Sequence, residues 1–158
     1  ITIDAPRERV WSTISDLALR PSFCDHFQEE FRLQRIESTG RGAAARFHLD
    51  APRRPFWMET VLDELEAPHA LLERGRGGFT DRIPADTAWE LREGAGSICE
   101  VRLSFWTSPE RGIDRVLDRL SSTGWHERQW RRALTRLRDL CESGAAVEPI
   151  RVAGASRP

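Results

Sequence analysis

Among the titratable side chains of this sequence, we consider three as candidates for proton transfer, Glu59 and the adjacent pair His126 and Glu127. An imidazole or a carboxylate beside an apolar cavity can act as a general acid or base, so these three are the candidate catalytic residues. The run from His126 to Trp130 begins like the HExxH zinc motif, but Trp130 stands where the second His ligand is required. We therefore expect no metal site here, and the four histidines show no other ligand spacing.

The residue types that are missing exclude further chemistry. All 24 basic residues of the 158-residue sequence are Arg, and the sequence also lacks Asn and Tyr. Without Lys there is no Schiff-base nucleophile, pyridoxal-phosphate anchor or Walker-type phosphate loop, and without Tyr there is no phenolic acid. No glycine-rich segment follows a strand and opens a helix, so we expect no nucleotide cofactor. The codons of Lys, Asn and Tyr begin with AA or TA, and the absence of these residues is typical of a GC-rich bacterial genome.

The charge balance and the cysteines indicate which binding partners and which cellular compartment to expect. The formal net charge is -1, and Asp and Glu are interspersed with Arg throughout, so the sequence does not predict a nucleic-acid-binding face. No segment approaches the roughly 20 apolar residues of a membrane span. Cys24, Cys99 and Cys141 form no CxxC motif, which favours reduced thiols in the core of a cytoplasmic protein.

Hydrophobic periodicity predicts a single α+β domain. Apolar residues at helical spacing follow Pro6 and stop at Pro21, and the helical period returns after Pro109 as far as Cys141, with Gly144 at a C-cap position. The apolar residues before and after 121–124 lie on different sides of this last helix, which predicts a bend at 121–124. Between the helical regions, turns rich in Gly and Pro separate strands near 31–38, 43–50, 56–66, 70–76, 86–93 and 97–107, and a short strand opens the chain at 1–3. We expect a curved antiparallel sheet with one face packed against the long C-terminal helix.

Four segments carry a recognisable pattern: ITIDAPRERVWSTISDLALRPSF, FWMETVLDELEAPHALLERGRGG, TAWELREGAGSICEVRLSF and WHERQWRRALTRLRDL. They contain a P-x-x-x-V-W helix start, a W-x-x-x-V strand, a W-x-L strand with a Gly turn, and an amphipathic last helix. The pattern spans 1–143 and resembles the START-like, or helix-grip, superfamily, in particular its polyketide cyclase/dehydrase (SRPBCC) branch. This resemblance implies a seven-stranded sheet gripping the last helix around a cavity for an apolar or amphipathic small molecule. Residues 144–158 are expected to form a mobile tail.

Strand alternation indicates which side chains would line that cavity. In the last strand the apolar residues alternate with charged ones, which places Val101, Leu103 and Phe105 toward the helix. By the same rule Trp89, Leu91 and Phe47 face inward, whereas His48 points to solvent.

Strand 56–66 resists this sorting because it has large apolar residues on both faces. The family's W-x-x-x-V pattern implies that Trp57 and Glu59 face inward, and the alternative is an outward Glu59 beside an Arg. If the apolar stripe of the last helix is extended backward, Thr123, His126 and Glu127 lie at the edge of the helix that faces the cavity. The alternative is that they are ordinary residues of the first helical turn. The candidate ligand-binding residues are Phe47, Trp57, Glu59, Trp89, Leu91, Val101, Leu103, Thr123, His126, Glu127 and Trp130.

We predict a protein that binds a hydrophobic or amphipathic small molecule, lipid-like or polyketide-like, as a carrier or sensor rather than as a catalyst. The resemblance also implies an alternative, a polyketide cyclase or dehydratase that needs no metal or nucleotide cofactor and uses a cavity carboxylate or His. A second alternative is a protein-interaction module whose cavity is filled by Trp57, Trp89 and Trp130. Exposed Trp106 and Trp125 could then form an apolar patch for a homodimer.

Overall fold

The computed structural model describes residues 1–52, 55–78, 83–108 and 123–152. Its strands are β1 (Thr2–Asp4), β2 (Gln28–Leu33), β3 (Ala44–Leu49), β4 (Phe56–Glu66), β5 (Ala70–Gly77), β6 (Ile83–Glu93) and β7 (Ile98–Thr107). Its helices are α1 (Arg7–Ile14), the 3-10 turn η1 (Leu17–Leu19), α2 (Pro21–Cys24) and α4 (Thr123–Ser143). The predicted helical stretch 113–120 lies outside the described residues, as does most of the predicted bend at 121–124.

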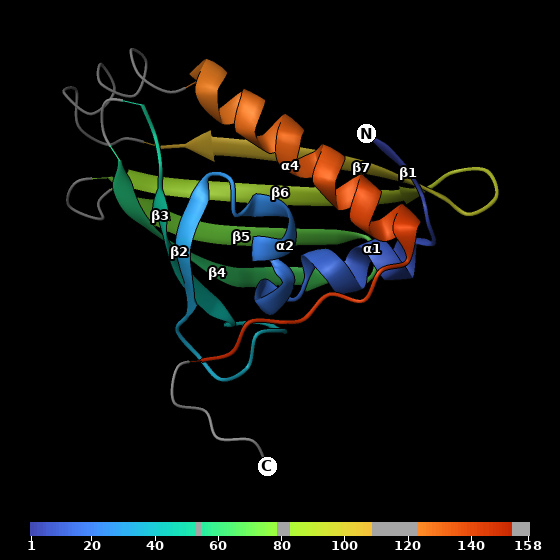
Figure 1. The fold of residues 1–158 in the computed structure, drawn as a ribbon, viewed down its shortest axis with the longest axis horizontal. Coiled ribbons are helices and arrows are strands. Elements are labelled where there is room, and N and C mark those ends of the chain that lie inside the picture. Colours follow the sequence, from blue (N-terminus) through green and yellow to red (C-terminus); the bar gives the residue numbers. More distant parts are fainter. Residues whose placement is uncertain (53–54, 79–82, 109–122, 153–158) are drawn as a thin grey trace.

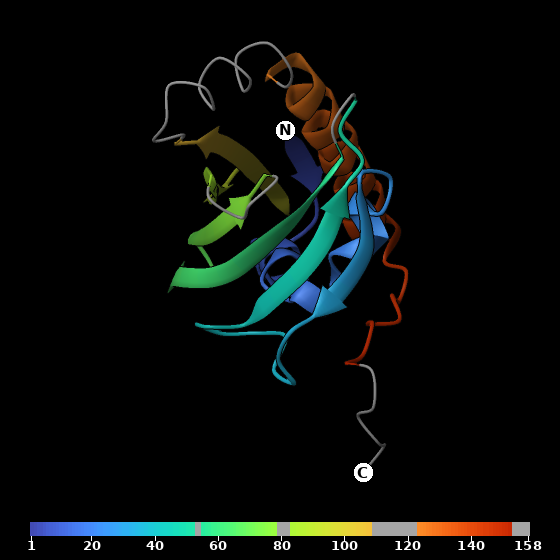
Figure 2. The same ribbon diagram turned by 90° about the vertical axis from the view of Figure 1, so that its left-hand side faces the viewer.

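Within these residues the strands form one seven-stranded antiparallel sheet in the order β1-β7-β6-β5-β4-β3-β2. Each strand from β2 to β7 pairs with its neighbour in sequence, as the short turns predict, and β1 pairs with β7. The sheet curves, and α4, α1 and α2 all lie over the same face of it (Figures 1 and 2). The predicted helix-grip architecture is confirmed.

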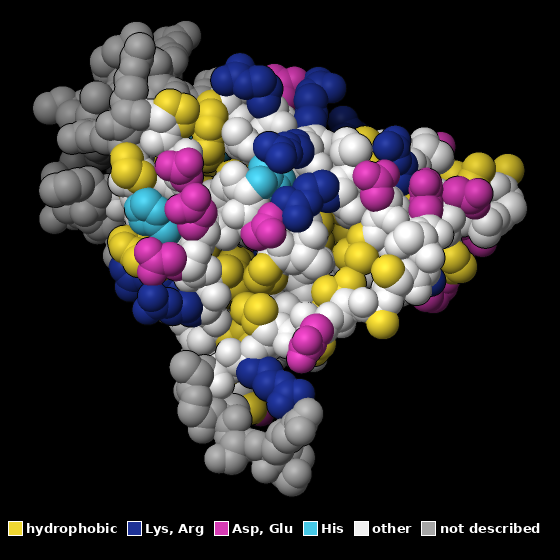
Figure 3. Space-filling view, in the orientation of Figure 1, with side chains coloured by type: hydrophobic (Ala, Val, Ile, Leu, Met, Phe, Trp, Pro, Cys, Tyr) yellow, Lys and Arg dark blue, Asp and Glu magenta, His cyan; other side chains and the backbone are white. Residues whose placement is uncertain are grey.

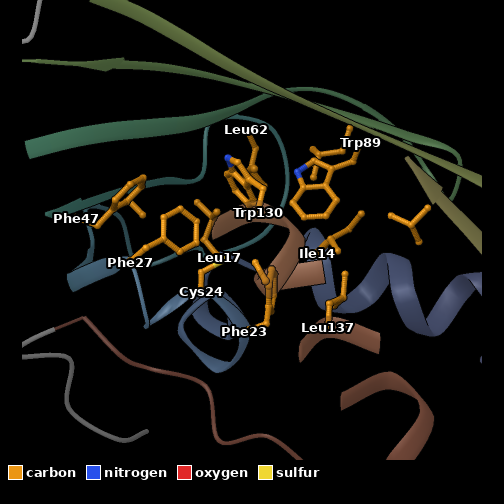
Figure 4. Packing of buried hydrophobic residues seen from close by; sticks show 14 of the residues in the cluster. Ile14, Leu17, Phe23, Cys24, Phe27, Phe47, Leu62, Trp89, Trp130 and Leu137 are labelled. Carbon is orange, nitrogen blue, oxygen red and sulfur yellow. The ribbon is translucent and has the colours of Figure 1, made fainter. Parts of the chain in front are cut away.

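The core fills the space between the curved sheet and α4 (Figure 4). Trp89 of β6 and Trp130 of α4 meet edge to face, with ring centroids 5.9 Å apart, and Phe27 lies 5.2 Å from Trp130. Phe23 of α2 contacts Trp89 from the other side in a second edge-to-face pair. Burial of each such side chain contributes about 1.5–3 kcal/mol, so these rings fix the position of α4 over the sheet.

Strand β2 begins three residues before the predicted strand at 31–38. Gln28 and Phe27 are buried, and the Phe27 ring packs against Trp125 and Trp130 of α4, which anchors the start of β2 directly after α2. Glu30 adopts a φ of 47°, and the register with β3 shifts between Glu29 and Arg32. This bulge interrupts the pairing, which resumes at Arg32 and Leu33, and such bulges are common at a sheet edge.

The segment after α4 lies against the domain. Gly144 has a φ of 71° and ends the helix, as its position predicted. Farther on, the Ile150 amide donates to the carbonyl oxygen of Ala18 at 3.0 Å, and Ile150 and Val152 pack on the core. Ile150 and Val152 therefore contact the domain beside η1, and a mobile tail over residues 144–158 stays a prediction.

The outer face of α4 is basic (Figure 3), as its sequence predicts. Arg128, Arg131 and Arg132 are exposed. Arg131 forms an ion pair with Glu127 one turn earlier, at 2.7 Å, so part of this charge is neutralised along the helix itself. Among the described residues, no helix is long and apolar enough to span a bilayer.

Candidate functional site

A half-open groove of about 890 Å³ lies between β7 and the first turns of α4. Ile1 and Thr2 are among its lining residues, and the backbone groups of Ile1 and Val101 form two reciprocal hydrogen bonds there, at 2.7 and 2.8 Å. The volume falls within the range of small-molecule sites, roughly 300–1,000 Å³.

The groove has an apolar floor and a charged rim. Apart from Ile1, the apolar residues come from β7 and α4 and are Val101, Leu103, Phe105, Trp106, Trp130 and Leu134. The charged residues carry both signs and are Glu90, Arg92, Glu100, Arg102, Glu127 and Arg131. Trp106 is 41% exposed, so a large aromatic surface is open to solvent beside the groove. Such a surface is suited to a molecule with an apolar body and polar substituents.

Three rings separate this groove from the interior. Phe105, His126 and Trp130 line the groove and also line a second, enclosed cavity of about 10 Å³. The Phe105 ring centroid lies 5.0 Å from that of His126 and 6.2 Å from that of Trp130. Of the two spaces that the described residues line here, the interior one is small, and the larger one lies outside this ring partition.

The far wall of the enclosed cavity carries a buried ion pair between Glu73 of β5 and Arg20, which precedes α2. Both side chains are at most 3% exposed. Arg20 Nη2 and Trp89 Nε1 donate to Glu73 Oε1, the latter at 2.8 Å, and Thr60 Oγ1 donates to Glu73 Oε2 at 3.0 Å. Every partner is a donor, so this arrangement suits an ionised carboxylate.

The Arg20 guanidinium is held on several sides. It lies 5.4 Å from the Trp89 ring and 5.6 Å from the Phe23 ring, which are cation–π distances. Burial alone would lower the pKa of Arg20, but the Glu73 carboxylate outweighs it and raises that pKa. The pair ties the start of α2 to the middle of the sheet.

The structure brings five of the candidate ligand-binding residues to the groove: Val101, Leu103, His126, Glu127 and Trp130. Phe47 lines the enclosed cavity, and Trp89 and Leu91 are core residues. Thr123 is the first residue of α4, and its side chain lies outside the described part of the structure. Glu127 is held by Arg131 through two hydrogen bonds, at 2.7 and 3.1 Å.

The expectation that Trp57 and Glu59 face the cavity is wrong. In β4 the buried residues are Met58, Thr60 and Leu62, so the alternate positions 57 and 59 lie on the outer face. Trp57 is accommodated there because the guanidinium carbons of Arg46 and Arg32 lie 5.3 and 5.9 Å from its ring. Glu59 stands between Arg46 of β3 and Arg76 of β5 in the sheet register, which matches the alternative of an outward carboxylate beside Arg.

The proposed dimerisation patch of Trp106 and Trp125 does not form. Trp106 is exposed, but Trp125 is only 9% exposed and packs against Phe27 and His126, with ring centroids 6.2 and 4.9 Å away. His48, by contrast, lies on the outer face beside Trp57 as predicted. Cys24, Cys99 and Cys141 are free and buried, and burial raises the pKa of each thiol, which favours the unreactive protonated form.

His26 connects the end of α2 to α4. Arg136 Nη1 lies 3.0 Å from His26 Nδ1, and His26 Nε2 lies 3.2 Å from the Gln129 carbonyl oxygen. Because Arg can only donate, Nδ1 accepts and Nε2 carries the proton in a neutral ring. Desolvation lowers the pKa of His26, and Arg132 and Arg136 lower it further, against opposing contributions from the Gln129 carbonyl and Asp25.

This arrangement predicts a pH-dependent stability. As the pH falls, His26 becomes protonated in the unfolded chain near its ordinary pKa of about 6.5, whereas in the folded protein it becomes protonated only at a lower pH. The free energy of unfolding therefore decreases as the pH drops below about 6.5. We expect His26→Gln, whose amide can both accept and donate, to flatten the fall in Tm between about pH 7 and pH 5. An unchanged slope would contradict this role, and His48→Gln on the outer face is the matched control.

This fold has relatives among known protein families and solved structures. The family described as polyketide cyclase / dehydrase and lipid transport matches residues 1–142. Among solved structures, the chain is similar to the KanY protein (18% identity, TM-score 0.67, 90% of this chain and 93% of that one) and to major latex-like protein 151 from Panax ginseng (7% identity, TM-score 0.67, 89% and 93%). It is also similar to the di-domain ARO/CYC StfQ of the steffimycin biosynthetic pathway (12% identity, TM-score 0.64), covering 91% of this chain and 44% of that one.

None of the curated proteins matches the chain. The solved structures are too distant in sequence to show more than a common fold. The family match, by contrast, covers almost every described element from β1 to α4. The curved seven-stranded sheet, the long helix held against it and this match together show that the chain belongs to the polyketide cyclase/dehydrase and lipid transport family.

Proposed function

We propose that this protein binds a hydrophobic or amphipathic small molecule, lipid-like or polyketide-like, in the groove between β7 and α4, as a carrier or sensor. The observation that carries the proposal is the groove of about 890 Å³ with its apolar floor and charged rim. An apolar molecule would cover Leu103, Phe105 and Trp106, while its polar substituents could meet Arg102 or Glu127 at the rim. The family's own description, which includes lipid transport, supports a ligand of this class.

A charge placed on the groove floor tests this proposal. We expect Leu103→Arg to weaken the binding of the uncharged dye Nile red by about tenfold or more, because the guanidinium occupies the apolar floor and must be desolvated by the dye. The measurement is a fluorescence titration of the purified protein. Retained tertiary structure is verified by near-UV circular dichroism.

The matched control is Leu72→Arg, the same substitution at a half-buried position of β5 that lies outside the groove lining. It is expected to bind the dye as the unaltered protein does. If Leu103→Arg folds and binds the dye with unchanged affinity, the groove is not the binding site and the proposal fails.

A second candidate function is a cyclase or dehydratase, and the position of His126 favours it. The ring of His126 lies at the boundary between groove and interior, where a bound polyketide-like chain would pass it, and imidazole is the commonest acid–base group in enzymes. Mass spectrometry after incubation with aromatic polyketides separates the two functions. A compound returned unaltered supports the carrier, whereas a compound that is altered by the protein but not by His126→Gln supports the enzyme.

The proposed setting is the cytoplasm of a bacterium. The three buried free cysteines suit a reducing compartment, where thiols remain unpaired. The interaction-module alternative requires a collapsed cavity, and a groove of about 890 Å³ favours a small ligand over that alternative.

A further inference from the structure

Two buried polar atoms next to the enclosed cavity have no hydrogen-bond partner. They are the indole nitrogen Nε1 of Trp130 and the amide oxygen Oε1 of Gln28. Both side chains are more than nine-tenths buried, with exposed fractions of 6% and 4%, and both line the cavity of about 10 Å³. Leaving such a group unpaired costs about 1–3 kcal/mol, so a donor and an acceptor placed together at one cavity indicate a site for a polar group.

The position of this cavity connects it to the groove. It lies directly behind Phe105 and His126, whose rings line the groove on their other side. Figure 4 shows Trp130 beside Trp89 with its indole nitrogen turned toward the sheet. A ligand lying in the groove would therefore reach Trp130 Nε1 and Gln28 Oε1 by displacing the Phe105 ring, with no change in the sheet.

We propose that the ligand bound in the groove inserts a hydroxyl group behind Phe105, where the hydroxyl accepts from Trp130 Nε1 and donates to Gln28 Oε1. The inference rests on the proposed function, since it names the chemical group by which that site selects its ligand. A volume of about 10 Å³ corresponds to about one water-sized group, so the inserted group is small, such as a phenol or alcohol hydroxyl at the end of an apolar body.

The neighbouring charges exclude other polar groups from this position. The Glu73 carboxylate lines the same cavity and would repel a carboxylate or phosphate, and Arg20 already neutralises Glu73, so an added ammonium would be uncompensated. An ammonium also has no acceptor for the Trp130 N–H, and a carbonyl has no donor for Gln28. A hydroxyl supplies one of each and leaves the Glu73 network intact.

A pair of probes that differ only in the hydroxyl tests this assignment. Naphthol and naphthalene have the same ring system, and their dissociation constants are compared by equilibrium dialysis. Two hydrogen bonds to otherwise unpaired buried groups should make naphthol bind about tenfold or more tightly than naphthalene. Naphthol should also shift the Trp130 indole N–H resonance downfield in a ¹H–¹⁵N spectrum, where the resonance lost in Trp130→Phe gives its assignment.

Variants then assign the preference to the two side chains. Gln28→Leu and Trp130→Phe each remove one partner and should reduce the preference for naphthol to about threefold or less. The matched controls are Gln34→Leu, at an exposed position, and Trp125→Phe, one turn earlier on α4 and outside both linings. Both controls should keep the full preference.

The outcomes separate this inference from the function on which it rests. Equal affinities for naphthol and naphthalene, or a preference that survives both Gln28→Leu and Trp130→Phe, would overturn the hydroxyl assignment while leaving the groove as a ligand site. Absence of binding by both probes would overturn the proposed function and this inference with it.

Discussion

Replacing Arg20 with Met is expected to lower the free energy of unfolding by about 3–5 kcal/mol, because it leaves the Glu73 carboxylate buried without a counter-charge. The side chains of this pair are 2% and 3% exposed, so water cannot replace the lost guanidinium without opening the core. Thr60 and Trp89 would remain as donors to Glu73, but neither carries a charge. Urea unfolding followed by tryptophan fluorescence measures the loss.

The double variant Arg20→Met with Glu73→Gln is the control for this explanation. It removes both charges and keeps an acceptor for Trp89 Nε1, so it should recover at least half of the stability lost by Arg20→Met alone. A double variant as unstable as the single one would show that the loss comes from packing of the Arg20 side chain rather than from an uncompensated charge.

Replacing Leu137 with Ala is expected to cost about 2–5 kcal/mol. Leu137 is fully buried on the face of α4 that packs on α2 and β1, and its truncation leaves a cavity that rigid neighbours on the sheet and α2 cannot fill. Leu140 is half-buried on the same helix and provides the matched control, since Leu140→Ala removes the same atoms from a position with solvent on one side.

Chemical denaturation of the two variants compares these costs directly. We expect Leu137→Ala to be the more destabilising by at least about 1 kcal/mol. A cost below about 1 kcal/mol for Leu137→Ala would mean that the buried face of α4 has been assigned incorrectly.

The alternation of apolar and polar residues indicated which face of β7 forms the groove wall, but it did not indicate which face of β4 turns inward. In β7 one face is apolar and the other charged, so only one orientation buries Val101 and Leu103. In β4 both faces carry large apolar residues, and the orientation depends on contacts from elsewhere. Thr60 faces inward because its hydroxyl meets Glu73, whereas Trp57 is covered outside by Arg32 and Arg46.

The buried ion pair escaped the sequence analysis for a related reason. Glu73 shares its face of β5 with Leu71 and Gly75, both buried, and this alternation could have placed it inside. A charged residue is ordinarily read as exposed, however, and its partner Arg20 lies 53 positions away in another element. The position of the groove was not predicted either, because it depends on how β7 and α4 pack together and not on a residue motif.

The uneven attachment of α4 also bears on how a ligand could enter. The second half of the helix is fixed by buried Leu137 and Cys141 and by Arg136, which binds Asp25 and His26. The first turns border the groove on one side, and the rings of Trp125, His126 and Trp130 anchor them on the other. Local opening of a protein requires least free energy where few apolar contacts must be broken. A ligand is therefore expected to enter by displacing side chains of β7 and of the first turns, while the second half of α4 keeps its contacts.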